Sequence, residues 1–255
     1  MVEKHNLAQK GTITVGKTGG VFASVSESDG IYQPVYADSG IPDTEYVVRA
    51  VGNIVTPDGS LRYADGEIVA RLKTGADGTA VTEPLYLGKY AVYEVTAAYG
   101  MTVSSEPEIV ELTYAGENIA VTSAEVSFYN ERQKAEISLD KILEQDEEFG
   151  IGMNGEILSV RFGLFAAEDL TAVDGSIIPA DGLLEIGSCS ENGHFVFQTD
   201  VPVGAKLYVK EIATDNHYLL SDEKYPVEFV YAGQDTAVVE IRANEGEAIK
   251  NNLIY

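Results

Sequence analysis

The stretch DGSLRYADG at residues 58–66 returns as DGSIIPADG at residues 174–182, at an offset of 116 residues. Further landmarks recur in the same order at offsets of 115 to 117: Asp77-Gly78 with Asn192-Gly193, Leu87-Gly88 with Val203-Gly204, Glu94 with Glu211, and Tyr114-Ala115-Gly116 with Tyr231-Ala232-Gly233. Several landmarks in one order, with a drift of two residues, indicate an internal repeat. The sequence therefore predicts two copies of one domain.

The copies meet at the polar stretch NERQK, residues 130–134, which predicts domains at 1–132 and 133–255 with a short junction. The first copy is longer near its start. Lys17 precedes Asp58 by 41 residues, whereas Lys141 precedes Asp174 by 33. We therefore expect an insertion near residues 21–42 of the first domain.

Both copies consist of short segments rich in Val, Phe, Tyr and Ile that end at Asp-Gly, Asn-Gly or Ala-Gly turns. Examples are YAVYEV at 90–95, HFVFQT at 194–199 and KLYVKEI at 206–212. No helical period is sustained for long, and about seven strands in roughly 120 residues are typical of a β-sandwich. The predicted fold is all-β: two tandem antiparallel β-sandwiches of the Ig-like or prealbumin-like kind.

Composition excludes several classes of function. The 255 residues contain 17 Lys and Arg against 41 Asp and Glu, a formal net charge of −24, and nucleic acids or anionic lipids repel such a chain. The single cysteine, Cys189, cannot form an intramolecular disulfide, and the scattered His5, His194 and His217 do not suggest a zinc site. The Asp-Gly pairs fit hairpin turns better than calcium loops. We expect no metal and no cofactor.

Three polar residues in each copy extend an otherwise apolar face of a strand, because every second residue of a strand points to the same side. In the first copy they are Lys17 after Ile13 and Val15, Glu94 after Tyr90 and Val92, and Asn130 after Val126 and Phe128; in the second, Lys141 after Ile137 and Leu139, Glu211 after Leu207 and Val209, and Asn251 after Ile249. The sequence therefore predicts a buried lysine, glutamate and asparagine in each domain.

Burial gives this set a specific chemistry. Desolvation lowers the pKa of a lysine towards the neutral amine, which is a nucleophile, and a side-chain amide is an electrophile. A glutamic acid protonated by the same burial would polarise the amide carbonyl and pass a proton to the leaving ammonia. The expected product is a Lys–Asn isopeptide bond between the first and last strands of each domain.

Simpler interpretations stay open for each residue type. A lysine at a strand end can extend its amine to solvent. Glu94 and Glu211 would face solvent if their strands had the opposite register, since Tyr93, Val95, Tyr208 and Ile212 are also apolar. Asn252 is an alternative to Asn251, although the alternation with Ile249 favours Asn251.

Several ordered motifs resemble one family across both copies. YLGKYAVYEVTAAYGM at 86–101 and VPVGAKLYVKEIATDNHYLL at 201–220 resemble the Leu-Pro-x-Gly-Lys-Tyr-x-x-Lys-Glu segment of the collagen-adhesin B-type (prealbumin-like, SpaA-like pilin) domains of Gram-positive surface proteins. TITVGKT at 12–18 and EISLDKI at 136–142 are similar to the family's first strand. VSFYNER at 126–132 and AIKNNLI at 248–254 are similar to its closing strand.

The resemblance implies a seven-stranded sandwich with a self-formed Lys–Asn bond promoted by an acid. It assigns Lys17, Glu94 and Asn130 to one site and Lys141, Glu211 and Asn251 to the other, with the two glutamates as the catalytic acids. The sequence departs from the family's pattern in its insertion, and it contains neither a sortase-type Leu-Pro-x-Thr-Gly signal nor a Tyr-Pro-Lys polymerisation motif.

The expected function is structural: non-enzymatic stalk modules of a bacterial cell-surface adhesin or pilin-like protein. The alternative is a ligand-binding adhesin module that recognises a host protein or glycan, with the inserted segment around Tyr32 and Tyr36 as the contact surface. A turnover enzyme is disfavoured, because the isopeptide reaction happens once in each domain.

The expected location is extracellular, in a parent protein attached to the cell wall. The start MVEKH has no apolar signal core, and the chain ends on NNLIY without a polar tail. We therefore expect a fragment of a longer protein whose signal and anchor are absent. It should be a monomer that meets host partners only through its parent, with no nucleic-acid partner and no membrane insertion.

Overall fold

The structure is a computed structural model that describes residues 8–254, so His5 and Tyr255 lie outside the described residues. The described chain divides into two compact units. Unit 1 consists of the residues up to Gly20, Asp38–Arg132 and Gly233–Asp235, and unit 2 of Val21–Ala37, Gln133–Ala232 and the residues from Thr236 on. Nearly all regular structure is strand, which confirms the predicted all-β class.

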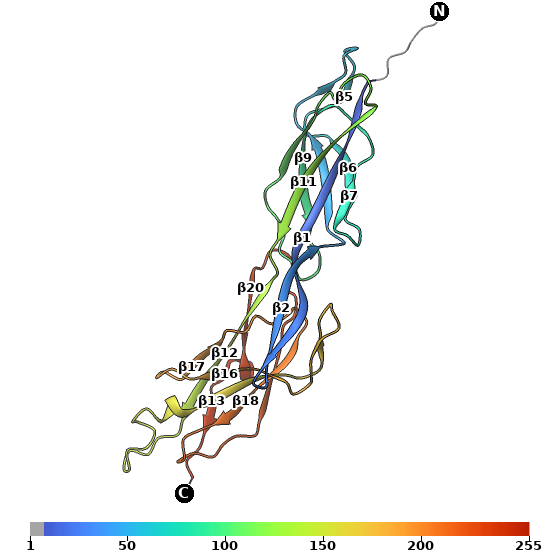
Figure 1. Ribbon diagram of the computed structural model, residues 1–255. Coiled ribbons are helices and arrows are strands. Elements are labelled where there is room, and N and C mark those ends of the chain that lie inside the picture. Colours follow the sequence, from blue (N-terminus) through green and yellow to red (C-terminus); the bar gives the residue numbers. More distant parts are fainter. Residues whose placement is uncertain (1–7, 255) are drawn as a thin grey trace, which may run out of the picture. The chain divides into compact units, whose positions relative to one another are not determined.

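Unit 1 is built from two layers of strands around an apolar core (Figure 1). Its strands are β1 (Lys10–Ser28) up to Gly20, β3 (Glu45–Ala50), β4 (Ile54–Val55), β5 (Leu61–Tyr63), β6 (Ile68–Lys73), β7 (Thr79–Val81), β8 (Leu85–Tyr86), β9 (Gly88–Thr96), β10 (Glu108–Leu112) and β11 (Val121–Asn130). One layer has the antiparallel order β10-β9-β3-β6. In the other, β1 pairs with β7 and β8 in antiparallel fashion and with β11 in parallel.

Unit 2 repeats this plan. Its strands are β12 (Lys134–Leu143), β13 (Arg161–Ala166), β14 (Leu170–Thr171), β15 (Ile177–Ile178), β16 (Leu183–Ser188), β17 (His194–Phe197), β18 (Lys206–Ala213), β19 (Lys224–Glu228), β20 (Val238–Arg242) and β21 (Ile249–Asn251), with short 3-10 helices η1 (Glu156–Ser159) and η2 (Ala243–Gly246). One layer has the order β16-β13-β18-β19, and the other centres on β12, which pairs with β17 in antiparallel fashion and with β20 and β21 in parallel.

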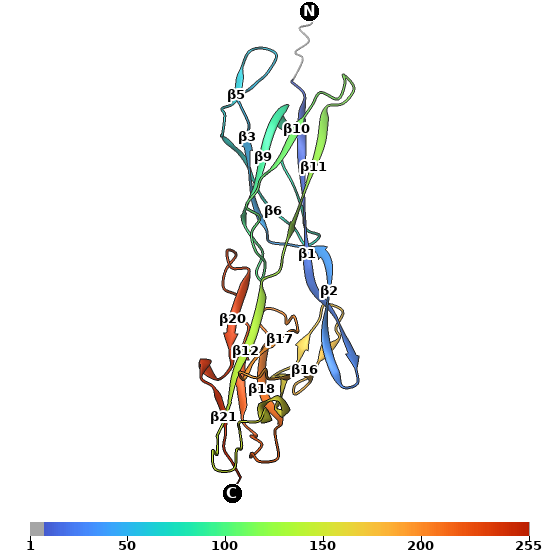
Figure 2. The same ribbon diagram turned by 90° about the vertical axis from the view of Figure 1, so that its left-hand side faces the viewer.

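The parallel pairs are an addition to the antiparallel sandwich that the turn-rich sequence predicts. In each unit the first strand lies beside the last, and the two run in the same direction (Figures 1 and 2). A parallel pair cannot be joined by a tight hairpin, so a connection that crosses the rest of the domain must intervene. First and last strands therefore become direct neighbours although about 110 residues separate them.

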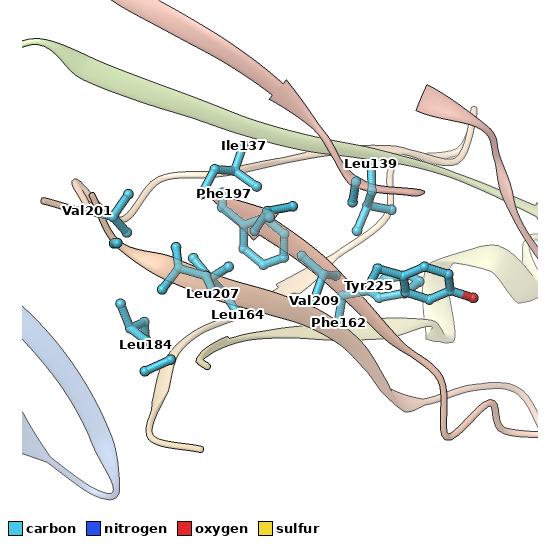
Figure 3. Close-up of a cluster of buried hydrophobic side chains, with 14 of the residues drawn as sticks. Ile137, Leu139, Phe162, Leu164, Leu184, Phe197, Val201, Leu207, Val209 and Tyr225 are labelled. Carbon is cyan, nitrogen blue, oxygen red and sulfur yellow. The ribbon is translucent and has the colours of Figure 1, made fainter. Parts of the chain in front are cut away.

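Alternating burial fixes which side of these strands faces the core. Along β1, Ile13, Val15 and Lys17 are buried while their neighbours are at most half-buried. In unit 2, Ile137 and Leu139 of β12 face the apolar side chains of the opposite layer (Figure 3). The opposite layer contributes Phe162 and Leu164 from β13 and Leu207 and Val209 from β18. Each lysine thus continues the inward side of its first strand.

The insertion is a β-hairpin formed by the end of β1 and by β2 (Ile31–Gly40). Its turn is Asp29-Gly30, whose φ angles of 53° and 78° are those of the tight hairpin turn that Asp-Gly favours. Residues 21–37 of this hairpin belong to unit 2, where β2 pairs in parallel with β16 at Ile31 and Leu183. The compact units therefore differ from the expected domains, 1–132 and 133–255, in two segments. Residues 21–37 belong to unit 2, and Gly233–Asp235 belongs to unit 1.

Candidate functional site

The parallel register brings the predicted lysine and asparagine together in both units. On β1 and β11, Lys17 is opposite Phe128 and Asn130 lies two residues further along. On β12 and β21, Lys141 is opposite Ile249 and Asn251 again lies two residues further along. Residues two apart on a strand point to the same face, so each asparagine side chain shares the inward face with its lysine.

A tight turn fixes the backbone of each lysine. The N–H of Lys17 donates to the carbonyl of Gly78 at 2.8 Å, and the N–H of Lys141 donates to that of Gly193, also at 2.8 Å. These glycines have φ angles of 79° and 81°. A Cβ on Gly78 would lie 2.5 Å from the Lys17 carbonyl oxygen, and one on Gly193 would lie 2.0 Å from that of Lys141. The turns Asp77-Gly78 and Asn192-Gly193 are therefore close approaches that only glycine permits.

Each glutamate reaches the site from the opposite layer. Glu94 on β9 pairs with Tyr46 on β3, and Glu211 on β18 pairs with Phe162 on β13. In both cases the pair lies next to a register shift, between Glu45 and Tyr46 or between Arg161 and Phe162. An irregularity of this kind redirects a side chain. The register in which the glutamates face solvent is thereby excluded, since both side chains are fully buried.

In unit 1 the glutamate lies between the other two residues. Lys17 Nζ donates to Glu94 Oε2 at 2.9 Å, and Asn130 Nδ2 donates to Glu94 Oε1. Lys17 and Asn130 are 1% and 2% exposed. Among the described residues, Asn130 Oδ1 has no hydrogen-bond partner. The carboxylate thus holds the amine and the amide nitrogen on its two oxygens.

In unit 2 the lysine contacts the asparagine directly. Lys141 Nζ donates to Asn251 Oδ1 at 2.6 Å and lies 3.3 Å from Glu211 Oε1. Asn251 Nδ2 lies 2.9 Å from both oxygens of Glu211 and 3.1 Å from Thr214 Oγ1. Asn251 is 2% exposed, whereas Asn252, the alternative from the sequence, is exposed. The amine, the amide and the acid of unit 2 therefore each contact the other two.

Burial shifts the titration of the groups around both sites. Desolvation lowers the pKa of Lys17 and of Lys141, although the neighbouring carboxylate opposes the shift in each case. Desolvation likewise raises the pKa of the Tyr46 hydroxyl, and the Glu94 charge adds to this. In unit 2 it raises the pKa of the buried Cys189 thiol to about 11, so this cysteine stays protonated at neutral pH. The direction for the lysines favours the neutral amine, the form that attacks carbonyl carbon.

The arrangement suits proton delivery to the amide nitrogen more than polarisation of the carbonyl. In both units the glutamate contacts the asparagine at Nδ2. In unit 2 the carbonyl oxygen is occupied by Lys141 Nζ instead. A carboxyl group at Nδ2 is in place to protonate a leaving nitrogen. Of the two roles that the sequence suggests for the glutamate, the contacts fit this one.

Comparison with known proteins identifies the fold of the first copy. Residues 42–126 match the SpaA family model, described as a prealbumin-like fold domain. These residues are a SpaA-type domain. The match confirms the family resemblance for this stretch, which includes Glu94 but neither Lys17 nor Asn130. A search of curated proteins found no match.

One solved structure extends the likeness in fold beyond these residues to 96% of the chain. The Bacillus anthracis TIE protein is 16% identical with a TM-score of 0.57, over 96% of this chain and 34% of that one, so the chain spans about a third of its length. A streptococcal ancillary pilin is 16% identical over 100% and 65%, with a TM-score of 0.32. The minor pilin GBS52 of Streptococcus agalactiae is 14% identical over 96% and 97%, with a TM-score of 0.31.

Some contacts at the two sites have no side-chain signal in the sequence. The backbone N–H of Ser104 donates to Glu94 Oε2 at 3.4 Å, and that of Ser221 donates to Glu211 Oε2 at 3.1 Å. Each serine lies ten residues after its glutamate. Backbone donors are independent of residue type, so only the equal loop lengths of the two copies could have indicated them. Thr214, by contrast, is a side chain that the sequence reasoning missed.

Another repeated contact lies at the start of each copy, where a glutamine holds the loop of the Tyr-Ala-Gly motif. Gln9 Oε1 accepts from the N–H of Ala115 at 3.0 Å, and Gln133 Oε1 accepts from that of Ala232 at 2.8 Å. Both glutamines lie eight residues before the lysine. This spacing was available in the sequence as a further sign of the repeat.

The inserted hairpin packs within unit 2. Tyr32 contacts the apolar core of that unit, and the Tyr36 hydroxyl donates to the Asp200 carbonyl at 2.9 Å. Both tyrosines are half-buried. Packing therefore covers part of each ring, and the alternative adhesin hypothesis rests on the part that stays exposed. Among residues 8–254, no helix is long and apolar enough to cross a membrane.

Proposed function

We propose that the two units are stalk modules of a Gram-positive cell-surface protein of the adhesin or pilin type, each locked by a Lys–Asn isopeptide bond. The bonds join Lys17 to Asn130 and Lys141 to Asn251, with Glu94 and Glu211 as the acids. One observation carries the proposal: the same three buried residue types meet at the same strand register in both copies.

The reaction balances within each site. Lysine transfers a proton to the glutamate, which leaves a neutral amine and a carboxylic acid. The amine nitrogen forms a bond to Cγ of the asparagine, the bond from Cγ to Nδ2 breaks, and Nδ2 leaves as ammonia. The carboxylic acid protonates Nδ2 as it leaves, and the resulting carboxylate takes up the proton that the amine nitrogen loses, so the glutamate ends as a carboxylic acid. No oxidant, metal or cofactor enters.

A module of this kind is a structural part, because the reaction consumes its own side chains and cannot turn over. A bond between the first and last strands closes a loop of about 110 residues. By analogy with a disulfide, closing such a loop stabilises the folded state by about 5 kcal/mol. The chain contains one cysteine, so this cross-link takes the place that disulfides have in other extracellular proteins. The parent protein is wall-attached and displays a tip that meets host proteins or glycans, and these modules remain monomeric.

The proposal is tested by the intact mass of the folded chain. Wild type should be lighter than its sequence mass by two molecules of ammonia. Peptide mapping should join the Lys17 peptide to the Asn130 peptide and the Lys141 peptide to the Asn251 peptide. Glu94→Ala and Glu211→Ala should each restore one ammonia mass in their own unit.

Glu83→Ala and Glu223→Ala serve as matched controls, because these glutamates lie outside both sites and should leave the mass deficit unchanged. A wild-type mass equal to the sequence mass would reject both bonds. A single deficit would restrict the proposal to the unit whose peptides are joined.

A further inference from the structure

Thr214 contacts the asparagine of unit 2 and has no counterpart in unit 1. Its Oγ1 accepts a hydrogen bond from Asn251 Nδ2 at 3.1 Å, while the carboxylate of Glu211 accepts from the same nitrogen at 2.9 Å. A carboxamide nitrogen carries two hydrogens. Both are therefore held, and Asn251 Oδ1 accepts from Lys141 Nζ at 2.6 Å.

The loop that carries Thr214 is tied to the strand that carries Asn251. The N–H of Leu219 donates to the Asn252 carbonyl at 3.3 Å, and that of Ile254 donates to the His217 carbonyl at 2.9 Å. Tyr218, which is 2% exposed, donates from its hydroxyl to the Glu144 carbonyl at 2.8 Å. The threonine hydroxyl is thus held at a fixed place relative to the amide.

Unit 1 has the same loop with a different residue at this position. Thr214 follows Glu211 by three residues, and Ala97 follows Glu94 by three. The loops agree elsewhere, since Thr102 N–H donates to the Glu131 carbonyl at 3.0 Å, as Leu219 N–H does to that of Asn252. Alanine offers no acceptor, and Asn130 Oδ1 lacks a hydrogen-bond partner among the described residues. The two units thus provide a natural comparison at one side chain.

We infer that Thr214 is a positioning residue that holds the Asn251 amide with its carbonyl towards Lys141 and its nitrogen towards Glu211. This inference rests on the proposed isopeptide function. It adds that the bond of unit 2 forms faster than the bond of unit 1, because an amide held at both ends spends more time in the reactive orientation. Thr214 itself does not exchange protons or electrons with the reacting atoms.

The test follows both bonds during synthesis of the full chain. Cell-free synthesis is stopped with acid at intervals, and peptide mapping quantifies the two joined peptides separately. In wild type the Lys141–Asn251 bond should appear first. Thr214→Val keeps the branched shape but removes the acceptor, and should slow that bond about tenfold, the effect of one hydrogen bond on a rate. It should leave the bond of unit 1 unchanged.

Two further variants separate positioning from folding. Thr214→Ser restores the hydroxyl and should restore the wild-type rate, which a purely structural role of the methyl group would not predict. Ala97→Thr should speed the bond of unit 1. Protease resistance of unit 2 shows whether Thr214→Val folds. If it does not, the rates in Thr214→Ser and Ala97→Thr still test the role of the hydroxyl.

The outcomes distinguish the two claims. Two ammonia losses in wild type with unchanged rates in Thr214→Val and Ala97→Thr would overturn the role of Thr214 and leave the isopeptide proposal standing. No ammonia loss in wild type would reject both. Equal wild-type rates in the two units would also contradict the inference.

Discussion

Lys17 of unit 1 donates to the glutamate of its site, whereas Lys141 of unit 2 donates to the asparagine. The difference arises although strand register, the turn glycine and the burial of all three residues are the same in both units. The repeated strands therefore determine which side chains meet. The order of their hydrogen bonds depends on the surroundings, where unit 2 has Thr214 and unit 1 has Ala97.

The aromatic neighbours of the lysines also differ. Lys17 Nζ lies 5.8 Å from the ring centroid of Phe128 on the last strand, and Lys141 Nζ lies 5.9 Å from that of Phe162 in the opposite layer. An aromatic face stabilises a cation, and an apolar ring also removes water from the amine. The aromatic ring beside the lysine thus comes from a different strand in each unit. The chemistry of the site requires an apolar ring beside the lysine, but it does not determine which strand supplies that ring.

The largest expected effect is the loss of either proposed bond, and it should be the same in both units. Asn130→Ala or Asn251→Ala leaves the buried Lys–Glu pair in place and opens a loop of about 110 residues. We predict that each variant lowers the free energy of unfolding of its own unit by about 5 kcal/mol. Hydrogen exchange, resolved for each unit, measures this free energy of unfolding, and thermal unfolding gives the corresponding melting temperatures.

Asn252→Ala is the matched control for unit 2, since Asn252 is exposed beside the buried Asn251, and it should leave stability unchanged. A large loss in one unit and none in the other would show that the two sites are not equivalent in function.

Substitution of the turn glycines should have the next largest effect and should separate the units. Gly193→Ala places its Cβ 2.0 Å from the Lys141 carbonyl oxygen, and Gly78→Ala places it 2.5 Å from that of Lys17, both at positive φ. We predict a loss of about 3 kcal/mol, larger in unit 2. Chemical denaturation of each variant tests the order.

Gly59→Ala and Gly175→Ala are controls with similar positive φ but open space around the Cβ, so they report the backbone strain of about 1 kcal/mol alone. If the controls cost as much as Gly78→Ala and Gly193→Ala, the close approach to the lysine strand contributes nothing.

A smaller effect on stability should show that the inserted hairpin contributes to the core of unit 2. Phe22 lies in the first half of the sequence but packs against the apolar core of unit 2. We predict that Phe22→Ala destabilises unit 2 by about 2 kcal/mol, because the side chain is only half-buried, and leaves unit 1 unchanged. Val35→Ala in the same hairpin removes an exposed side chain and should have no effect. Destabilisation of unit 1 by Phe22→Ala would contradict the assignment of the hairpin.

The sequence predicts the members of both sites because strand alternation and the repeat constrain the same six residues independently. Lys17 and Lys141 could be placed on inward faces from their own neighbours alone. The expected cross-link already places the first and last strands side by side, but their parallel direction could not be predicted, since it depends on how distant segments pack. The same holds for the hairpin: Asp29-Gly30 signals a turn, but nothing local shows that residues 21–37 pack in unit 2.

The hydrogen bonds of the sites were beyond the sequence for a different reason. Whether Lys Nζ contacts a carboxylate or an amide oxygen depends on side-chain orientation, which neighbours such as Thr214 influence. Alternation gives a face but not an orientation. The expected action of the glutamate on the carbonyl oxygen therefore differs from the observed contacts to Nδ2.

The smallest expected effect is a pH dependence that appears only when a bond is missing. In Asn130→Ala and Asn251→Ala the lysine is a free amine whose pKa burial holds below the ordinary value of 10.5. Between the lowered pKa and 10.5 the unfolded state binds one more proton than the folded state. The free energy of unfolding of each variant therefore rises with pH in that window and falls as pH drops through the folded pKa. The proposed bond makes this nitrogen an amide in wild type, and an amide does not titrate in this range.

The stability deficit of each variant relative to wild type should consequently shrink as pH is raised towards 10.5, and the two units should differ in how much. Lys17 lies 2.9 Å from Glu94, whereas Lys141 lies 3.3 Å from Glu211. The closer carboxylate opposes the lowering of the lysine pKa more strongly in unit 1. The pH range between the folded pKa and 10.5 is therefore narrower in that unit. We therefore predict a steeper pH dependence for Asn251→Ala than for Asn130→Ala. Melting temperatures of both variants and wild type across this range measure it, and a deficit that grows with pH would show that the lysine is held in its charged form.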